Sequence, residues 1–127
     1  MGMYTEVFFR AEVDEVSYGI MGKIIEGVDP AAFSDVHPLF GLPSAAGVFH
    51  CESYYHPGPF HRLFKHETPL QLWAVSFRSS LKNYDGEIEA FFDWVTPHVF
   101  PILGPQFIGY SLYEEATVPT LYYAKEN

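Results

Sequence analysis

Histidines and a cysteine, whose side chains are metal ligands, gather in the middle of the chain. Residues 50–66 include four histidines and the only cysteine of the chain, Cys51. Imidazole, thiolate and carboxylate groups are the ligands that zinc and similar ions take. The spacing contains neither a helical HExxH pair nor a CxxC, so it matches no common zinc pattern. We expect solvated loop histidines and a buried structural cysteine here, and the metal-ligand candidates are His50, His56, His61 and His66.

Two cationic residues lie where an expected strand ends and leads into the clearest expected helix. Arg78 and Lys82 precede Asn83 and Asp85, either of which can cap the helix that follows. Backbone N–H groups at a helix start can bind an anion, and cationic side chains can assist them. The segment lacks the GxxxxGK(S/T) pattern of a P-loop. The sequence therefore favours a structural turn, with Arg78 and Lys82 as the anion-site candidates.

Tyrosines lie in several of the expected strands, and two acidic residues directly follow Tyr113. Tyrosine is favoured at protein interfaces because it buries a large area at low entropic cost. It is also a good strand former, so an interface and plain strands both stay open as interpretations. The candidate recognition surface consists of Tyr54, Tyr55, Tyr110, Tyr113, Glu114 and Glu115.

Three carboxylates follow the possible cap Asp85 on the expected helix 85–95. Glu89 and Asp93 are four residues apart and share a helix face. That face lies largely opposite the apolar stripe that includes Ile88 and Phe91. We therefore expect Glu87, Glu89 and Asp93 to be solvated and not to form an acid–base pair.

Composition and charge exclude several classes of function. The chain has 127 residues, which suits one domain spanning 1–127, and 48% of them are hydrophobic. Seven basic residues against sixteen acidic ones give a net charge of -9, which argues against binding to nucleic acid or to an anionic membrane. A single cysteine, no secretory signal pattern and no apolar run of membrane-spanning length favour a reducing compartment, the cytoplasm.

Hydrophobic periodicity and turn residues predict an α+β domain. Strands are expected over 4–13, 47–56, 70–79, 106–113 and 120–124, and helices over 14–27 and 85–95. Residues 29–44 and 60–69 read as irregular connections. The order indicates a ferredoxin-like split β-α-β-β-α-β arrangement with an extra C-terminal strand. Two helices would cover one face of a largely antiparallel sheet, and long loops or a second copy of the chain would cover the other face.

Several segments resemble a family of small uncharacterised proteins of tailed bacteriophages and prophages. The resemblance rests on SYYHPG at 53–58, RSSLKNYDGEIEAFFDWV at 78–95 and GYSLYEEA at 109–116, and it extends to 3–9 and 119–123. It implies an origin in a phage genome that is expressed in the bacterial cytoplasm. It implies no known activity and no catalytic residues.

Two functions of different classes follow from these observations. The favoured one is a non-catalytic phage accessory protein that recognises a host or defence macromolecule through an acidic, tyrosine-rich surface. The alternative is a small-molecule or metal-binding protein, or a hydrolase, that uses residues 50–66. No cofactor is expected, and the partners considered are an unidentified host or phage protein and a second copy of the chain.

Overall fold

The computed structural model describes residues 4–50, 60–65, 73–100 and 105–124. These residues form five strands, three α-helices and three short 3-10 helices. In chain order the elements are β1 (Thr5–Val13), α1 (Glu15–Ile25), η1 (Pro30–Phe33), η2 (Pro38–Gly41), α2 (Ala45–His50), β2 (Phe60–Lys65), β3 (Trp73–Leu81), α3 (Glu87–Val95), η3 (Thr96–His98), β4 (Gln106–Tyr113) and β5 (Thr120–Ala124).

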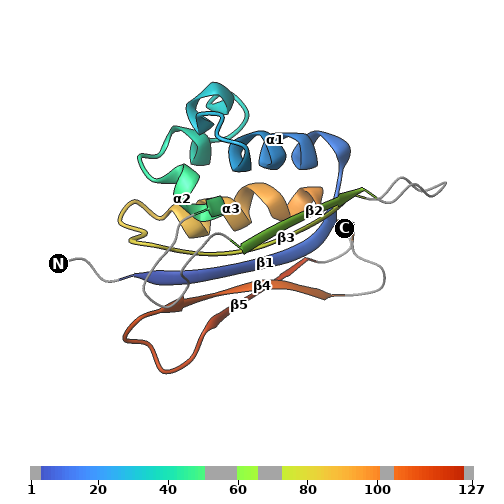
Figure 1. Ribbon diagram of the computed structural model, residues 1–127. Helices are drawn as coiled ribbons and strands as arrows, with labels where there is room; N and C mark the ends of the chain where they lie inside the picture. Colours follow the sequence, from blue (N-terminus) through green and yellow to red (C-terminus); the bar gives the residue numbers. More distant parts are fainter. Residues whose placement is uncertain (1–3, 51–59, 66–72, 101–104, 125–127) are drawn as a thin grey trace.

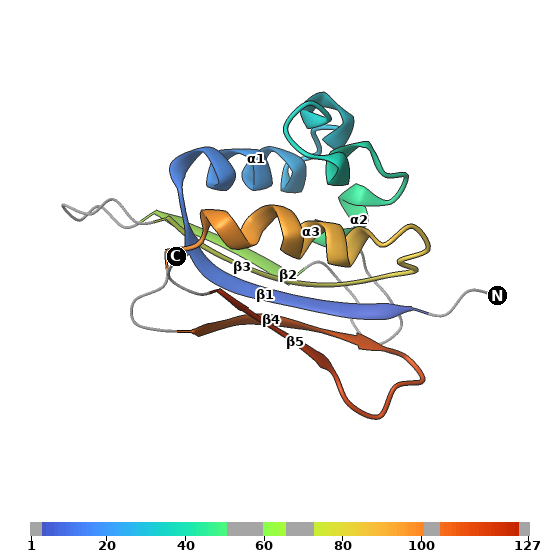
Figure 2. The same ribbon diagram turned by 180° about the vertical axis from the view of Figure 1, so that it is seen from behind.

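The strands form one antiparallel sheet in the order β2-β3-β1-β4-β5. The helices α1, α2 and α3 lie on the same side of this sheet (Figures 1 and 2). β1 is the central strand, and its residues alternate between a buried face under the helices and a more exposed face. The α+β class that the sequence predicted is confirmed, with three α-helices in the described parts of the chain where two were expected.

An aromatic core fills the space between the sheet and the helices. Phe9 of β1 and Phe77 of β3 lie with ring centroids 5.5 Å apart. Phe91 of α3 meets Phe9 edge-on at 5.0 Å, and Phe49 of α2 meets Phe91 edge-on at 5.4 Å. All four rings are fully buried. Edge-to-face contacts of this kind add about 0.5–1.5 kcal/mol per pair beyond the burial of area.

Local sequence explains how α1 begins. Asp14 is the N-cap, as the sequence predicted, and its carboxylate accepts a hydrogen bond of 2.8 Å from the backbone N–H of Ser17. The second carboxylate oxygen of Asp14 lies 2.7 Å from Nδ1 of His98. One side chain therefore caps α1 and also connects it to the end of η3.

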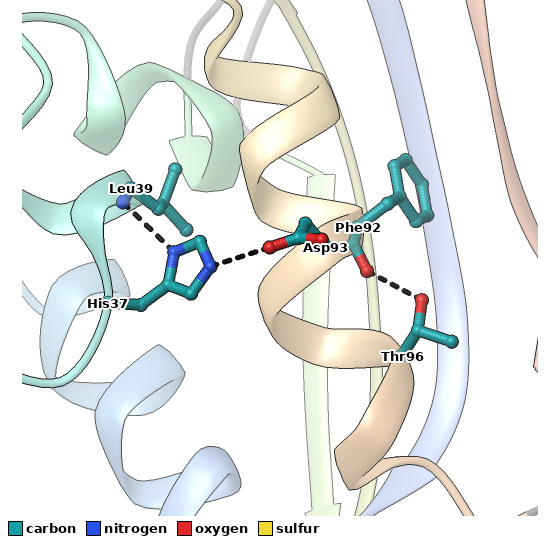
Figure 3. Close-up of polar contacts among 5 residues, drawn as sticks. All are labelled: His37, Leu39, Phe92, Asp93 and Thr96. Carbon is teal, nitrogen blue, oxygen red and sulfur yellow. Dashed lines mark hydrogen bonds and ion pairs between the residues drawn. The ribbon is translucent and has the colours of Figure 1, made fainter.

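A histidine performs a similar role for η2. Nδ1 of His37 accepts a hydrogen bond from the backbone N–H of Leu39, so Nε2 carries the proton that is donated to Asp93 of α3 at 2.9 Å (Figure 3). This pair joins the irregular connection 29–44 to the helix that follows β3. Leu39 and Phe40 of the same connection are buried in the core, as expected.

Two local predictions are wrong, and a third stops two residues too early. Residues 47–50 of the expected strand 47–56 belong to the helix α2, because Ala45, Val48 and Phe49 recur at helical spacing and all three are buried, and 51–56 lie outside the described residues. The expected loop 60–69 contains β2, which pairs with β3 at the edge of the sheet. The third expected strand, 70–79, continues to Leu81, which is also buried.

The expectation of a solvated Glu87 is also wrong. Its side chain has 0% exposure, and its carboxylate accepts hydrogen bonds from the backbone N–H groups of Ser44 and Asp85, both at 3.1 Å. Glu87 therefore joins the end of the 29–44 connection to the turn before α3. A buried carboxylate in such a place is stable only because backbone donors satisfy it.

Candidate binding site at the end of the sheet

Exposed apolar side chains gather on the hairpin that β4 and β5 form. Tyr113 is 44% exposed, Val118 is 71% exposed, and Leu121 and Tyr123 are 49% and 47% exposed. Glu114 and Glu115 lie in the connection between the two strands and are also exposed. This hairpin contains four of the sequence-predicted surface residues, namely Tyr110, Tyr113, Glu114 and Glu115.

A hollow of about 230 Å³, which we call the acidic hollow, lies at the end of β1 and β4. Two tyrosines and two carboxylates contribute to its lining, and none of the lining residues that the structure describes is basic. The lining consists of Tyr4, Glu6, Ser80, Leu112, Tyr113, Glu114 and Ala116.

Backbone and side-chain hydrogen bonds fix the rim of the acidic hollow. The N–H of Glu114 donates to the carbonyl oxygen of Tyr4 at 3.0 Å, and the N–H of Tyr4 donates to the Glu114 carboxylate at 3.3 Å. The N–H of Ala116 donates to the carbonyl oxygen of Tyr113 at 2.9 Å, which closes the turn after β4. The two tyrosines and Glu114 are therefore presented from backbone that is held on both sides.

The second carboxylate, that of Glu6, is held by a side chain of β4. The hydroxyl of Tyr110 donates a hydrogen bond to Glu6, and the Tyr110 ring stacks on Phe8 at 5.6 Å. Burial raises the pKa of Tyr110 to about 12, assisted by the hydrogen bond to Glu6 and by the Glu6 charge, while the nearby Arg78 guanidinium acts in the opposite direction. The phenol is therefore a hydrogen-bond donor at neutral pH.

A second, polar hollow of about 340 Å³ adjoins the first and shares Tyr113 and Ala116 with it. Lys82, Asn83 and Glu89 line it from the β3–α3 side. Several of its polar groups are already paired. The Asn83 amide nitrogen lies 3.1 and 3.2 Å from the two Glu89 oxygens, and Ser111 Oγ lies 3.2 Å from the Tyr122 hydroxyl.

The anion-site candidates lie beside different groups. Arg78 is close enough to Tyr110 to influence its ionisation, whereas the Lys82 ammonium lies 5.9 Å from the centre of the Tyr4 ring. The N-cap of α3 is Gly86 and not Asn83 or Asp85 as expected, although the Asn83 amide oxygen accepts a hydrogen bond from the Ile88 N–H at 2.8 Å. Glu87 and Glu89 bring negative charge to the same turn. The structure does not bring the two cations together at this helix start.

The histidine segment falls largely outside the described residues. His56, His66, Tyr54 and Tyr55 all lie there, as does Cys51, and His61 is described only through the backbone of β2. His50 ends α2. Within the described ranges, no three His, Cys, Asp or Glu side chains come together in a way that could hold a metal ion. The metal-binding and hydrolase alternative stays a prediction.

Sequence reasoning missed Tyr4 and Glu6. Glu6 lies between buried Thr5 and Val7, so strand alternation could have placed it on the more exposed face of the sheet. No local signal could have paired Tyr4 with Glu114, because 110 positions separate them.

Comparison of the chain with protein-family models, with curated proteins and with solved structures finds no match. No helix in the described parts of the chain is long and apolar enough to cross a bilayer.

Proposed function

We propose that this chain is a non-catalytic binding protein that takes a basic side chain of a partner macromolecule into the acidic hollow. The observation that carries the proposal is the lining of this hollow, where the carboxylates of Glu6 and Glu114 accompany the rings of Tyr4 and Tyr113. A lysine or arginine side chain matches both kinds of group, because its charge attracts carboxylates and also the face of an aromatic ring.

Electrostatics support a basic partner more broadly. The net charge of -9 attracts cationic surfaces and accelerates their encounter with the chain. The exposed Tyr113 and Val118 beside the hollow add apolar area that a partner can bury. Tyrosine is among the residues that contribute most at protein interfaces.

Tyr110 holds one of the two carboxylates of the acidic hollow in place. A phenol with a pKa of about 12 keeps its proton near neutral pH and positions Glu6 by donating to it. We propose that the partner is a host or defence protein of the bacterial cytoplasm. The resemblance to phage proteins supports this choice.

The detailed topology of the sheet is also part of the proposal. We propose that β1, β2, β3 and β4 form a ferredoxin-like core to which β5 is added. The strand order β2-β3-β1-β4 supports this, as do the helices between β1 and β2 and between β3 and β4.

A titration followed by NMR of the backbone amides tests the hollow directly. The probe is N-acetyl-arginine amide, and its matched control is N-acetyl-citrulline amide, which has the same shape without the charge. We expect the arginine probe to shift the amides of Leu112, Tyr113, Glu114 and Ala116, and the citrulline probe to leave them in place.

Variants locate the binding groups. Glu114→Gln should weaken binding of the arginine probe several-fold. Glu26→Gln, a change of the same kind at the exposed end of α1, should leave the binding unchanged. Equal shifts with both probes, or shifts spread over the helices, would refute the proposal.

A further inference from the structure

The sheet has an open face, opposite α1, α2 and α3, to which no helix in the described ranges contributes (Figures 1 and 2). Alternation along the strands places Glu6, Phe8 and Arg10 of β1 on the open face, because the residues between them are buried under the helices. Strand pairing extends the open face to Tyr110 of β4 and Leu121 of β5.

An apolar row crosses the open face. Phe8 pairs with Tyr110 on the neighbouring strand, and Tyr110 pairs with Leu121 on the next one. Leu121 is about half exposed, and so is Tyr123, whose ring lies 5.9 Å from that of Phe107. Exposing such an apolar row to water is unfavourable, so a surface that covers it gains binding free energy.

Charge selects the kind of surface that can cover it. The chain as a whole has sixteen acidic and seven basic residues. The described part of the open face is balanced in contrast, since alternation and pairing place Glu6 and Glu12 there together with Arg10 and Arg78. Two copies of this acidic chain repel each other over most of their surfaces, but they can meet at a neutral face.

We propose that a second copy of the chain docks on the open face, related by a twofold axis that passes over Phe8 and crosses the strands. This axis reverses the direction of β1 in the second copy. It therefore brings Arg10 of each copy over Glu6 of the other, and Phe8 over its own equivalent. The contact is isologous, as in most homodimers.

This inference deepens the proposed function and rests on it, because Glu6 also lines the acidic hollow. In solutions of the chain alone, Arg10 of the second copy is the basic side chain that the hollow receives. Arg10 is exposed and lies four residues along β1 from Glu6, on the same face.

The open face is large enough for such a dimer. The strands have nine, six, nine, eight and five residues. At typical strand spacings they cover about 600 Å² in projection. Side chains make the accessible area larger than the projection, and a standard interface buries about 800 Å² of accessible surface per partner.

Sedimentation equilibrium of the full chain across micromolar to millimolar concentrations tests the dimer. We expect a mass of two chains for the wild type. Leu121→Asp and Arg10→Glu should each weaken association roughly tenfold or more, because each places a carboxylate against acidic or apolar groups of the partner.

Matched controls lie on the helical side of the molecule. Val16→Asp and Lys23→Glu change exposed residues of α1 in the same way and should leave the dimer intact. A wild type that stays a single chain would overturn the inference. An equal loss of association in both pairs of variants would overturn it as well, since the dimer would then not depend on the open face.

The same variants separate this inference from the proposed function. Arg10→Glu leaves the lining residues of the acidic hollow unchanged, so the monomeric variant should still bind N-acetyl-arginine amide at Tyr113 and Glu114. If the wild type binds the probe but never dimerises, the proposed function stands and only the proposed dimer is overturned. An Arg10→Glu variant whose hollow does not bind the probe would overturn the proposed function and, with it, the pairing of Arg10 with Glu6.

Discussion

The hydroxyl of Tyr110 on β4 donates a hydrogen bond to the carboxylate of Glu6 on β1. Glu6 lines the acidic hollow, so Tyr110 fixes one of the two carboxylates that the proposed site depends on. Tyr110 itself is held by stacking on Phe8. The sheet thus positions the site through a chain of contacts across two neighbouring strands.

The ionisation of Tyr110 gives the first prediction. Its pKa of about 12 lies above the value of about 10 for a free tyrosine, so folding favours the protonated phenol. This contribution to stability is fully present below pH 10 and is lost as the pH rises toward 12. In a pH titration followed by tyrosine NMR signals, Tyr110 should ionise late, and Glu6→Gln should lower its pKa. A Tyr110 that ionises near pH 10 in the wild type would contradict the contact with Glu6.

Asp14 gives a prediction at acid pH. Burial raises the pKa of its carboxyl, but hydrogen bonds from Ser17 and His98 outweigh burial and leave the pKa below its ordinary value. The cap therefore stabilises the fold above the pKa of the unfolded chain, and this contribution is lost as the pH falls through the folded value.

Asp14→Ala should reduce the free energy of unfolding by about 1 kcal/mol at neutral pH. The difference from the wild type should shrink in acid, as measured by urea unfolding at several pH values. Asp35→Ala, a change at an exposed aspartate of the 29–44 connection, is the control and should have little effect. A deficit for Asp14→Ala that does not change with pH would argue against the cap.

Because the carboxylate of Glu87 is buried, we expect the conservative substitution Glu87→Gln to destabilise the fold. Glu87→Gln replaces one acceptor oxygen by an amide group that meets a backbone N–H, either that of Ser44 or that of Asp85. The free energy of unfolding should fall by about 1–3 kcal/mol. Urea unfolding of Glu87→Gln beside Glu26→Gln isolates the effect, because Glu26 is exposed. Equal stability of the two variants would show that Glu87 does not join these segments.

Two glycines should respond in opposite directions to the same substitution. A Cβ on Gly109 would overlap the carbonyl oxygen of Phe8 and lie 3.0 Å from Cζ of Phe92. Gly109→Ala should therefore destabilise the fold by about 1–3 kcal/mol. Gly19 lies inside α1 with no atom within 4 Å of an added Cβ, so Gly19→Ala should stabilise the fold by about 0.5–1 kcal/mol. Thermal unfolding of both variants checks the signs, and a stabilised Gly109→Ala would contradict the close approach of β4 to β1.

Local patterns predicted those elements whose signals lie within one segment. Asp14 and the apolar residues that follow it identified α1, and the bounds of β4 and β5 match the predicted 106–113 and 120–124. The helix α2 was missed because six residues carry too few helical periods, and its buried Phe49 suits a strand equally well.

The site depends on contacts that one sequence does not encode locally. Tyr113 and Glu114 were predicted as surface residues from their types, but their hollow forms only when β4 pairs with β1 and brings Tyr4 and Glu6 beside them. Glu87 was misplaced for the same reason, because Ser44, one of its donors, precedes it by 43 positions.

The most direct test of recognition through the acidic hollow is photo-crosslinking in bacterial lysate from a photoreactive residue at position 113. The same residue at position 16, on the exposed side of α1, is the control. The account predicts a protein that crosslinks from position 113 and not from position 16, at a segment that contains lysine or arginine, with loss of the crosslink in the Glu6→Gln and Glu114→Gln double variant. Equal crosslinking from both positions, or a captured segment without a basic residue, would contradict it.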